Sequence, residues 1–252
     1  MSDPQMQVAA FEAPGLSQVQ RVSSIFTAPS RTFDDIQRGN KRWWLPYLLA
    51  IFFGYLLFFA ITSKVGWQQV AENNMKMNPK QAERMDQMPP EQRASAMKIT
   101  AAITQGIAAA VPVTLILAAL LVSVILWPTI NFGFGGKATY GQILAVYFFA
   151  GLPGLLQPLI GAAALYAGLA PESFNINNFA GTNLAYYLPV DETNKALYAL
   201  ASQLDVVTIW VAILLSKGIA TVAGKKASAG YMTVFGWWGV WTLLRVVGGL
   251  LA

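Results

Sequence analysis

The chain has 252 residues, of which 55% are hydrophobic and 12% are charged, and its formal net charge is +5. It contains neither cysteine nor histidine, which excludes disulfides, thiolate chemistry, histidine acid–base catalysis and nearly every zinc or haem site. This composition is typical of a membrane protein, and positive charge that is spread along the chain without a basic and aromatic face predicts no nucleic-acid partner.

Residues 1–42 precede the first long apolar stretch and contain two short amphipathic patterns. We predict two short helices that lie on the membrane, with basic flanks that meet anionic lipid head groups on the cytoplasmic side. A docking site for a cytoplasmic protein is the alternative. The adjacent acids Asp34 and Asp35 are expected on a solvated helix face rather than in a metal site. The apolar positions at helical spacing are Leu16, Val19, Val22 and Phe26 in the first helix and Phe33 and Ile36 in the second, which ends at Gly39.

Residues 43–252 contain apolar stretches long enough to cross a bilayer, for which about 20 apolar residues are needed. Tryptophan is enriched at membrane interfaces, and we expect Trp43, Trp44 and Trp67 to anchor the two ends of the first span there. The sequence therefore predicts an all-α polytopic bundle of five transmembrane helices. The expected spans cover residues 46–63, 103–127, 141–168, 204–222 and 230–251.

The third expected span is interrupted by residues that disfavour a helix, namely Gly151, Pro153, Gly154, Pro158 and Gly161. Such residues free backbone polar groups that lipid cannot satisfy, so we expect this helix to be kinked or broken and to lie inside the bundle. A kink that serves packing is one interpretation. A broken helix that lines a path for a solute or lipid, as in transporters, is the other.

Only two charges fall clearly within the spans, Asp205 in the fourth and Arg245 in the fifth, with Lys217 near a span end. A charge at the centre of a bilayer costs about 2.5–3.5 kcal/mol on insertion scales. Both residues lie 20 positions from Lys225, in the turn between the spans, so an antiparallel hairpin returns them to similar depth. We predict that they pair, directly or through a water. The alternatives are an Arg245 that extends to the interface beside an interfacial Asp205, and an ion or proton pathway.

The lysine and arginine residues predict the orientation in the membrane. Nine of the 17 lie on the side of the N-terminus; apart from the long segment between the first two spans, only two lie on the opposite side. The positive-inside rule therefore favours a cytoplasmic N-terminus and an external C-terminus.

The segment between the first two spans is rich in methionine, with five methionines between residues 75 and 97. Thioethers at such spacing can hold Cu(I). Methionine also forms helices well and packs adaptably against apolar partners, which is the interpretation we favour. No metal or other cofactor is predicted.

Four motifs in fixed order resemble the bacterial branch of the Yip1 family: IFTAPSRTFDDI, RWWLP, GGKATYGQILAVYFFAGLP and LDVVTIWVAILLSKG, followed by a tryptophan-rich last span. The resemblance covers roughly residues 20 to 250. It implies a five-helix membrane domain with a cytoplasmic N-terminus. Eukaryotic relatives act in vesicle traffic, bind prenylated Rab GTPases and associate with one another, but the eukaryotic DLYGP signature is absent here. The fold therefore carries over better than the function.

Catalytic signatures such as GxSG, HExxH and GxxxxGK[ST] are absent from the sequence, so we predict that the chain is not an enzyme. Two functions remain open. One is a scaffold or adaptor in the inner (plasma) membrane that binds membrane lipids and an unknown protein partner and forms homo-oligomers. The other is a transporter or channel that uses the third span and the Asp205/Arg245 pair.

Overall fold

The computed structural model describes residues 15–77, 79–190 and 192–251 of the chain. Within these residues the fold is all-α, as predicted, and its β-type pairing is one isolated bridge between Asn183 and Asp205. The α-helices are α1 (Gln18–Thr27), α2 (Pro29–Gln37), α3 (Trp44–Lys64), α4 (Trp67–Lys76), α5 (Pro79–Asp86), α6 (Pro90–Ala109), α7 (Val111–Pro128), α8 (Tyr140–Ala150), α9 (Leu156–Tyr166), α10 (Lys195–Gln203), α11 (Val206–Val222) and α12 (Ala227–Leu251). The other helical turns are the π-helix η1 (Thr129–Gly133) and the 3-10 helices η2 (Leu152–Leu155), η3 (Pro171–Ser173) and η4 (Leu184–Tyr187).

Four stretches of the described residues have the length and apolar composition of membrane spans: Trp44–Lys64, Val111–Gly133, Tyr140–Tyr166 and Ala227–Leu251. The chain is therefore a multi-pass membrane protein. Helix α11, expected to be the fourth span, is apolar but has 17 residues. This corresponds to about 26 Å at 1.5 Å per residue, slightly less than the roughly 30 Å of a bilayer's hydrocarbon core.

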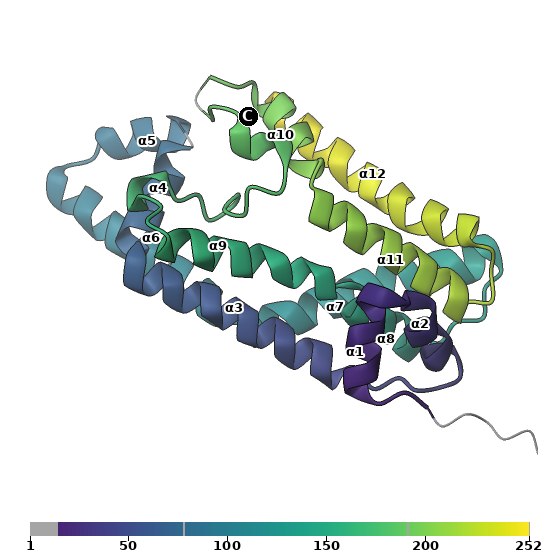
Figure 1. Ribbon diagram of the computed structural model, residues 1–252. Helices are drawn as coiled ribbons and strands as arrows, with labels where there is room; N and C mark the ends of the chain where they lie inside the picture. Colours follow the sequence, from purple (N-terminus) through teal and green to yellow (C-terminus); the bar gives the residue numbers. More distant parts are fainter. Residues whose placement is uncertain (1–14, 78, 191, 252) are drawn as a thin grey trace, which may run out of the picture.

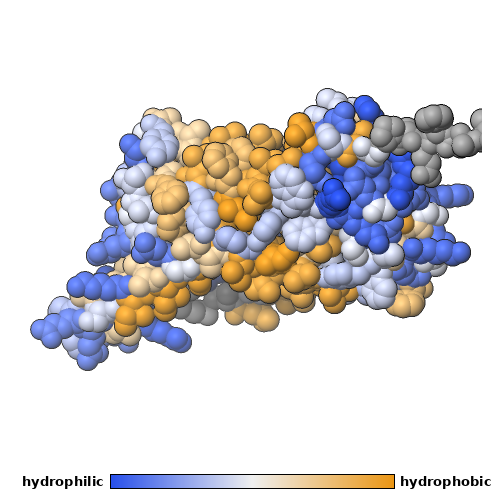
Figure 2. All heavy atoms as spheres, turned by 90° about the horizontal axis from the view of Figure 1, so that it is seen from below, coloured by the Kyte–Doolittle hydropathy of each residue, from blue (hydrophilic) through white to orange (hydrophobic). Residues whose placement is uncertain are grey.

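The helices form an elongated bundle with polar groups gathered at two ends. In Figure 1, α1 and α2 lie at one end, which we call the α2 end. Helices α5 and α10 lie at the opposite end, close to the C-terminus, and we call this the α10 end. Figure 2 shows an apolar belt between the hydrophilic ends. This distribution is expected of a bundle whose middle lies in hydrocarbon and whose ends meet head groups and water.

The second span does not run unbroken from residue 103 as predicted, because α6 ends at Ala109 and α7 starts two residues later. Pro112, in the first turn of α7, has no backbone N–H and cannot continue the hydrogen bonding of α6. Two tyrosines of α3 satisfy carbonyl groups at this junction. The Tyr55 hydroxyl donates to Ala109 O at 3.0 Å, and the Tyr47 hydroxyl donates to Pro112 O at 2.9 Å.

We expect the paired change Tyr47→Phe and Tyr55→Phe to lower the thermal stability of the protein in detergent. Each change removes a hydrogen bond worth about 0.5–1.5 kcal/mol, and Tyr55→Phe also leaves the carbonyl of Ala109, at the end of α6, without this donor. Tyr231→Phe is the matched control, because the structure shows a ring contact but no hydrogen bond for this described residue. Equal stability of the paired variant and the control would contradict the role of the two hydroxyls.

The third span combines α8, η2 and α9, and it lies inside the bundle as predicted. Of the 18 most apolar consecutive residues of this span, 50% are buried, whereas the corresponding share is 22% for the first span and 6% for the last. Helical hydrogen bonding reaches into η2, because the Gly151 N–H donates to Tyr147 O at 3.0 Å and the Gly154 N–H donates to Gly151 O at 2.9 Å. Gly161 allows close packing, since a Cβ there would lie 2.5 Å from the ring of Phe179.

One cluster of buried apolar side chains joins the N-terminal helices to the spans. It contains Ile25 of α1 and Phe33 of α2 together with Phe149 of α8 and Ile219 of α11. A Cβ on Gly218 of α11 would lie 2.8 Å from Cε1 of Phe33, so the glycine makes room for this ring. The N-terminal helices therefore share a core with the membrane spans.

A second cluster lies where α3, α4, α6 and α9 meet. Met85 and Met97 of the methionine-rich segment are buried in it beside Leu57 and Trp67, whereas Met88 is 39% exposed. The flexible thioether fills irregular gaps between apolar groups. Two of the five methionines thus serve packing, which is the interpretation favoured from the sequence.

Candidate functional site

A buried polar cluster lies where α1 and α2 fold into a hairpin. Local sequence signals set the ends of both helices. Ser17 caps α1 in a capping box with Gln20, and Pro29 occupies the first turn of α2. Gly39 follows α2 with a φ of 113°, a conformation that other residues rarely adopt, and the chain turns back toward α1 there.

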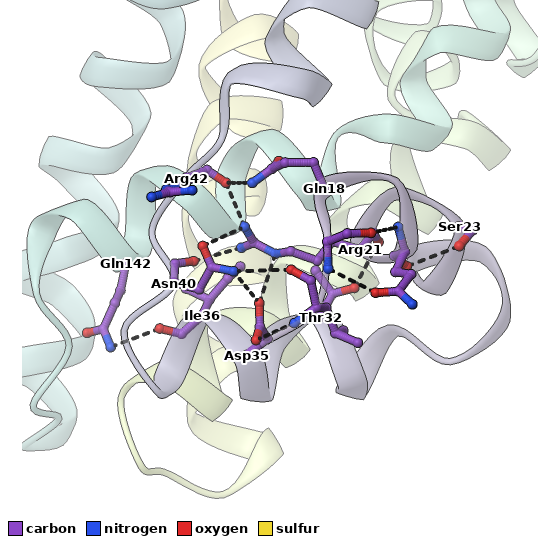
Figure 3. Close-up of polar contacts among 12 residues, drawn as sticks. Gln18, Arg21, Ser23, Thr32, Asp35, Ile36, Asn40, Arg42 and Gln142 are labelled. Carbon is purple, nitrogen blue, oxygen red and sulfur yellow. Dashed lines mark hydrogen bonds and ion pairs between the residues drawn. The ribbon is translucent and has the colours of Figure 1, made fainter. Parts of the chain in front are cut away.

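Arg21 lies at the centre of this cluster and is 0% exposed (Figure 3). Its Nε lies 3.3 Å from Oδ2 of Asp35 in an ion pair. Its terminal nitrogens donate to Asn40 O at 2.8 Å and to Arg42 O at 2.7 Å. The Asp35 carboxylate also accepts hydrogen bonds from Asn40 Nδ2 at 2.8 Å and from Leu16 N at 3.1 Å. The Asp35 carboxylate and the terminal nitrogens of Arg21 therefore have hydrogen-bond partners, whereas Arg21 Nε makes only the ion pair.

Three contacts fasten the hairpin to the membrane spans. The Arg21 guanidinium lies over the ring of Phe149 in α8, 4.2 Å from its centroid, which is a cation–π geometry. The Gln142 side chain, also from α8, donates to the Gln37 carbonyl oxygen at 3.1 Å. The Gln37 side chain in turn donates to Thr221 O near the end of α11 at 2.7 Å. The hairpin is thus tied to two different helices of the bundle.

The surroundings of Arg21 change its proton affinity. Burial lowers the pKa of Arg21 from its ordinary value to about 10, because desolvation disfavours the cation, and the Asp35 carboxylate partly offsets this effect. Arg21 therefore remains a cation at neutral pH, and the cluster holds a full positive charge among oxygen acceptors.

The buried face of the hairpin differs from the apolar face predicted from the sequence. Val19 is 70% exposed and Phe26 is 48% exposed, whereas α1 buries Arg21, Ser24 and Ile25. The helices therefore pack on the bundle through a mixed polar and apolar face rather than only lying on the membrane. Val19 faces away from the bundle, and Phe26 is half-exposed, with its ring edge-on to Trp210 of α11.

Sequence reasoning missed the pair of Arg21 and Asp35. Asp34 is exposed as predicted, but Asp35 is 2% exposed. Helical spacing gave little signal, because Asp35 lies two residues after Phe33 and one before Ile36, positions about 160° and 100° away around a helix. Arg21 likewise lies off the apolar face predicted for α1, so the pair is recognised only in the folded hairpin.

Asp205 has a different environment from the one predicted. It is 3% exposed and caps the N-terminus of α11. Its carboxylate accepts hydrogen bonds from the Thr208 N–H at 2.7 Å, from the Gln157 amide at 3.2 Å and from the Thr182 hydroxyl. The carboxylate is therefore held by neutral donors and by the positive end of the helix dipole.

The direct ion pair between Asp205 and Arg245 predicted from the sequence is not formed. Arg245 is exposed on α12, and the ion pairs found in the described part of the chain join other residues. Neutral donors already satisfy Asp205. Arg245 is exposed and lies six residues before the end of α12 at Leu251, and a long arginine side chain at such a position can extend to the membrane interface.

We expect Asp205→Ala and Arg245→Gln to affect thermal stability independently. The first change removes a helix cap worth about 0.5–2 kcal/mol and leaves its donors unpaired. The second changes an exposed side chain and should have little effect. Thermal unfolding of both single variants and the double variant in detergent checks this; a double variant more stable than the Asp205→Ala protein would indicate a pair bridged by water.

A cavity of about 420 Å³ adjoins the 3-10 turn of the third span, between α3, α7 and α11. Its lining is mainly apolar, with Gln157 and Thr208 as polar groups. Gln157 also binds Asp205, so the acid lies next to this cavity. Of the five helix-disfavouring residues of the third span, Gly151, Gly154 and Pro158 line the cavity, Pro153 is buried in η2, and Gly161 packs against Phe179.

The three tryptophans predicted as interfacial anchors have unlike surroundings. Trp44 is 50% exposed at the start of α3, as an anchor would be. Trp43 stacks on Phe148 with 4.6 Å between ring centroids. Trp67 is 7% exposed, and its indole donates to the Thr62 hydroxyl at 2.9 Å. Trp43 and Trp67 therefore pack within the protein.

The structure is all-α and contains several helices that are long and apolar enough to cross a membrane, with the α1–α2 hairpin packed against them. These features define a multi-pass membrane protein. The family model of the Yip1 domain matches residues 23–244, which is nearly the whole chain. The chain therefore belongs to the Yip1 domain family, as its motifs indicated. No match was found among curated proteins or among solved structures.

Proposed function

We propose that this protein is a non-enzymatic membrane scaffold that presents the α1–α2 hairpin to lipids and protein partners and that associates with copies of itself. The buried cluster of Arg21 and Asp35 carries this proposal, because Arg21 joins the two helices of the hairpin and also lies over the ring of Phe149 in α8. A surface that is already ordered loses less conformational entropy on binding than a mobile segment. The exposed Val19 and Phe26 offer apolar contacts to a partner.

We further propose that the chain crosses the inner (plasma) membrane five times, with the hairpin in the cytoplasm and the C-terminus outside. In Figure 1, α2 and the last turn of α12 lie at opposite ends of the bundle, which supports an odd number of crossings. Helix α11 would then be a short crossing, buried against α8 and α12. Apart from the long segment between the first two spans, lysine and arginine are in excess on the side of the hairpin, which supports this orientation.

The absence of cysteine from the chain allows a site-specific test of the scaffold. A photocrosslinker is attached to Val19→Cys or Phe26→Cys in native membranes. The control is Met88→Cys, a similarly exposed apolar position in the segment after α5. The scaffold predicts discrete protein adducts, including dimers of this chain, at the hairpin positions. The same adducts at Met88, or none at the hairpin, would contradict the proposal.

A transporter or channel is the second candidate, and the cavity beside the third span favours it. Its volume of about 420 Å³ lies within the range of roughly 300–1,000 Å³ typical of ligand sites. A single cysteine at Leu155, which lines this cavity, tests whether water reaches it. Labelling by a charged, water-soluble thiol reagent would support transport. Protection of Leu155→Cys, with exposed Ser228→Cys fully labelled, would support the scaffold.

A further inference from the structure

An open pocket of about 430 Å³ lies at the α2 end of the bundle. It is formed by the end of α2, the start of α8, the loop before α8 and the turn between α11 and α12 (Figure 1). The proposed scaffold does not use this pocket. Its lining includes Gln37, Gly135, Lys137, Gln142, Gly224 and Lys225.

The pocket is lined by two lysines and by no carboxylate. In the part of the chain that the structure describes, neither Lys137 nor Lys225 makes an ion pair or hydrogen bond through its side chain. The carboxylate of Asp35 is already bound by Arg21, and Asp34 does not line the pocket. Two like charges at one pocket repel each other, and an anion placed between them would remove this repulsion.

The two loops that carry the lysines are held close together. The Lys137 N–H donates to Ala223 O at 3.2 Å, which joins the loop before α8 to the end of α11. Gly135 and Gly224 have φ values of 66° and 65°, where a side chain would be strained. The Lys225 Nζ lies 3.5 Å from the place of a Cβ on Gly135, so this ammonium group folds over the opposite loop.

Both lysines lie where the helices leave the apolar belt. Lys137 follows the end of the second span, at Gly133, by four residues. Lys225 lies between the end of α11 at Val222 and the start of α12 at Ala227. This is the depth of lipid head groups, where a lysine attracts anionic phosphate.

We propose that this pocket binds a phosphate group, with the ammonium groups of Lys137 and Lys225 as donors to its oxygens. Lysine binds phosphate as a compact charge with several donor hydrogens, and such charge-assisted bonds are stronger than neutral ones. An anionic phospholipid head group and free phosphate share this chemistry. The site is independent of the proposed scaffold function and can be tested separately.

The test uses the full chain, purified in detergent and stripped of lipid. Thermal unfolding is followed at constant ionic strength during titration with phosphatidylglycerol, phosphatidylcholine or inorganic phosphate. Phosphatidylglycerol should raise the melting temperature more than phosphatidylcholine does. Stabilisation by phosphatidylglycerol alone assigns the site to a lipid head group, and equal stabilisation by inorganic phosphate assigns it to free phosphate. The absence of stabilisation by either would overturn the proposal.

The variant Lys137→Gln/Lys225→Gln should bind the stabilising ligand roughly 30-fold more weakly, which corresponds to about 1 kcal/mol per lysine. Lys137→Arg/Lys225→Arg should keep most of the affinity. The matched control is Arg31→Gln/Arg38→Gln, which removes two exposed charges of the α2 hairpin outside the pocket. If the double glutamine variant does not fold, the single change at exposed Lys137 should weaken binding roughly fivefold. Wild-type affinity without the lysines, or an equal loss in the control, would overturn the proposal.

Discussion

Replacing Arg21 with methionine is expected to release the α1–α2 hairpin from the spans while the rest of the bundle stays folded. The change leaves the Asp35 carboxylate buried without its cation, and breaking a buried ion pair from one side costs about 3–5 kcal/mol. Limited trypsin digestion in detergent measures the release. Cleavage at Arg31 and Arg38 should become much faster, because it follows the population of the opened hairpin.

The Asp35→Asn variant tests the same ion pair from the other side, since it leaves the Arg21 cation buried without its carboxylate. The double variant Arg21→Met/Asp35→Asn should lose less stability than the sum of the single changes, because neither residue then leaves an unpaired charge. Arg31→Met, an exposed change on α2, is the control; it removes one cleavage site but should leave cleavage at Arg38 as slow as in the unmodified protein. If the losses of stability in the two single variants simply add up in the double variant, the ion pair does not hold the hairpin.

Gly230→Ala is expected to disrupt the packing of α12 on α11. A Cβ at this position would overlap the carbonyl oxygen of Ser216 and would lie 2.9 Å from Cβ of Ala220. A backbone carbonyl cannot rotate away as a side chain can. The loss should therefore reach or exceed the roughly 1–3 kcal/mol typical of overpacking, measured as thermal unfolding in detergent.

Gly236→Ala is the matched control for this change. Gly236 lies on the same helix, but no atom lies within 4 Å of the place its Cβ would take. Alanine there should be neutral or should stabilise the helix by up to about 1 kcal/mol. Similar destabilisation by both alanines would mean that helix flexibility, rather than the close crossing of α11 and α12, makes Gly230 necessary.

The spans were the most predictable part of the fold, because the thickness of hydrocarbon sets their length. The first and last were expected at residues 46–63 and 230–251 and are observed at Trp44–Lys64 and Ala227–Leu251. The start of the second span was less predictable. Apolar composition continues across the break after Ala109, and the tyrosines that stabilise this break come from another helix.

The candidate site was harder to predict, because it depends on how helices face one another. Asp35 lies beside the apolar positions of α2 rather than among them, and Arg21 meets it only because α1 and α2 fold back on each other at Ala28. Asp205 and Arg245 both lie 20 residues from Lys225, which predicted that they lie at similar depths in the membrane. Each residue turns about 100° around a helix axis, so equal depth does not determine which side chains meet.

The distance between two spin labels tests most directly whether the hairpin is fixed to the spans. Labels are attached to Ser23→Cys on α1 and Ser228→Cys on α12, both exposed positions at the α2 end in a chain without other cysteines. Pulsed electron resonance in bilayers should give one narrow distance distribution, which Arg21→Met broadens. A broad distribution in the unmodified hairpin, or one that Arg21→Met leaves unchanged, would contradict a hairpin held by the buried ion pair.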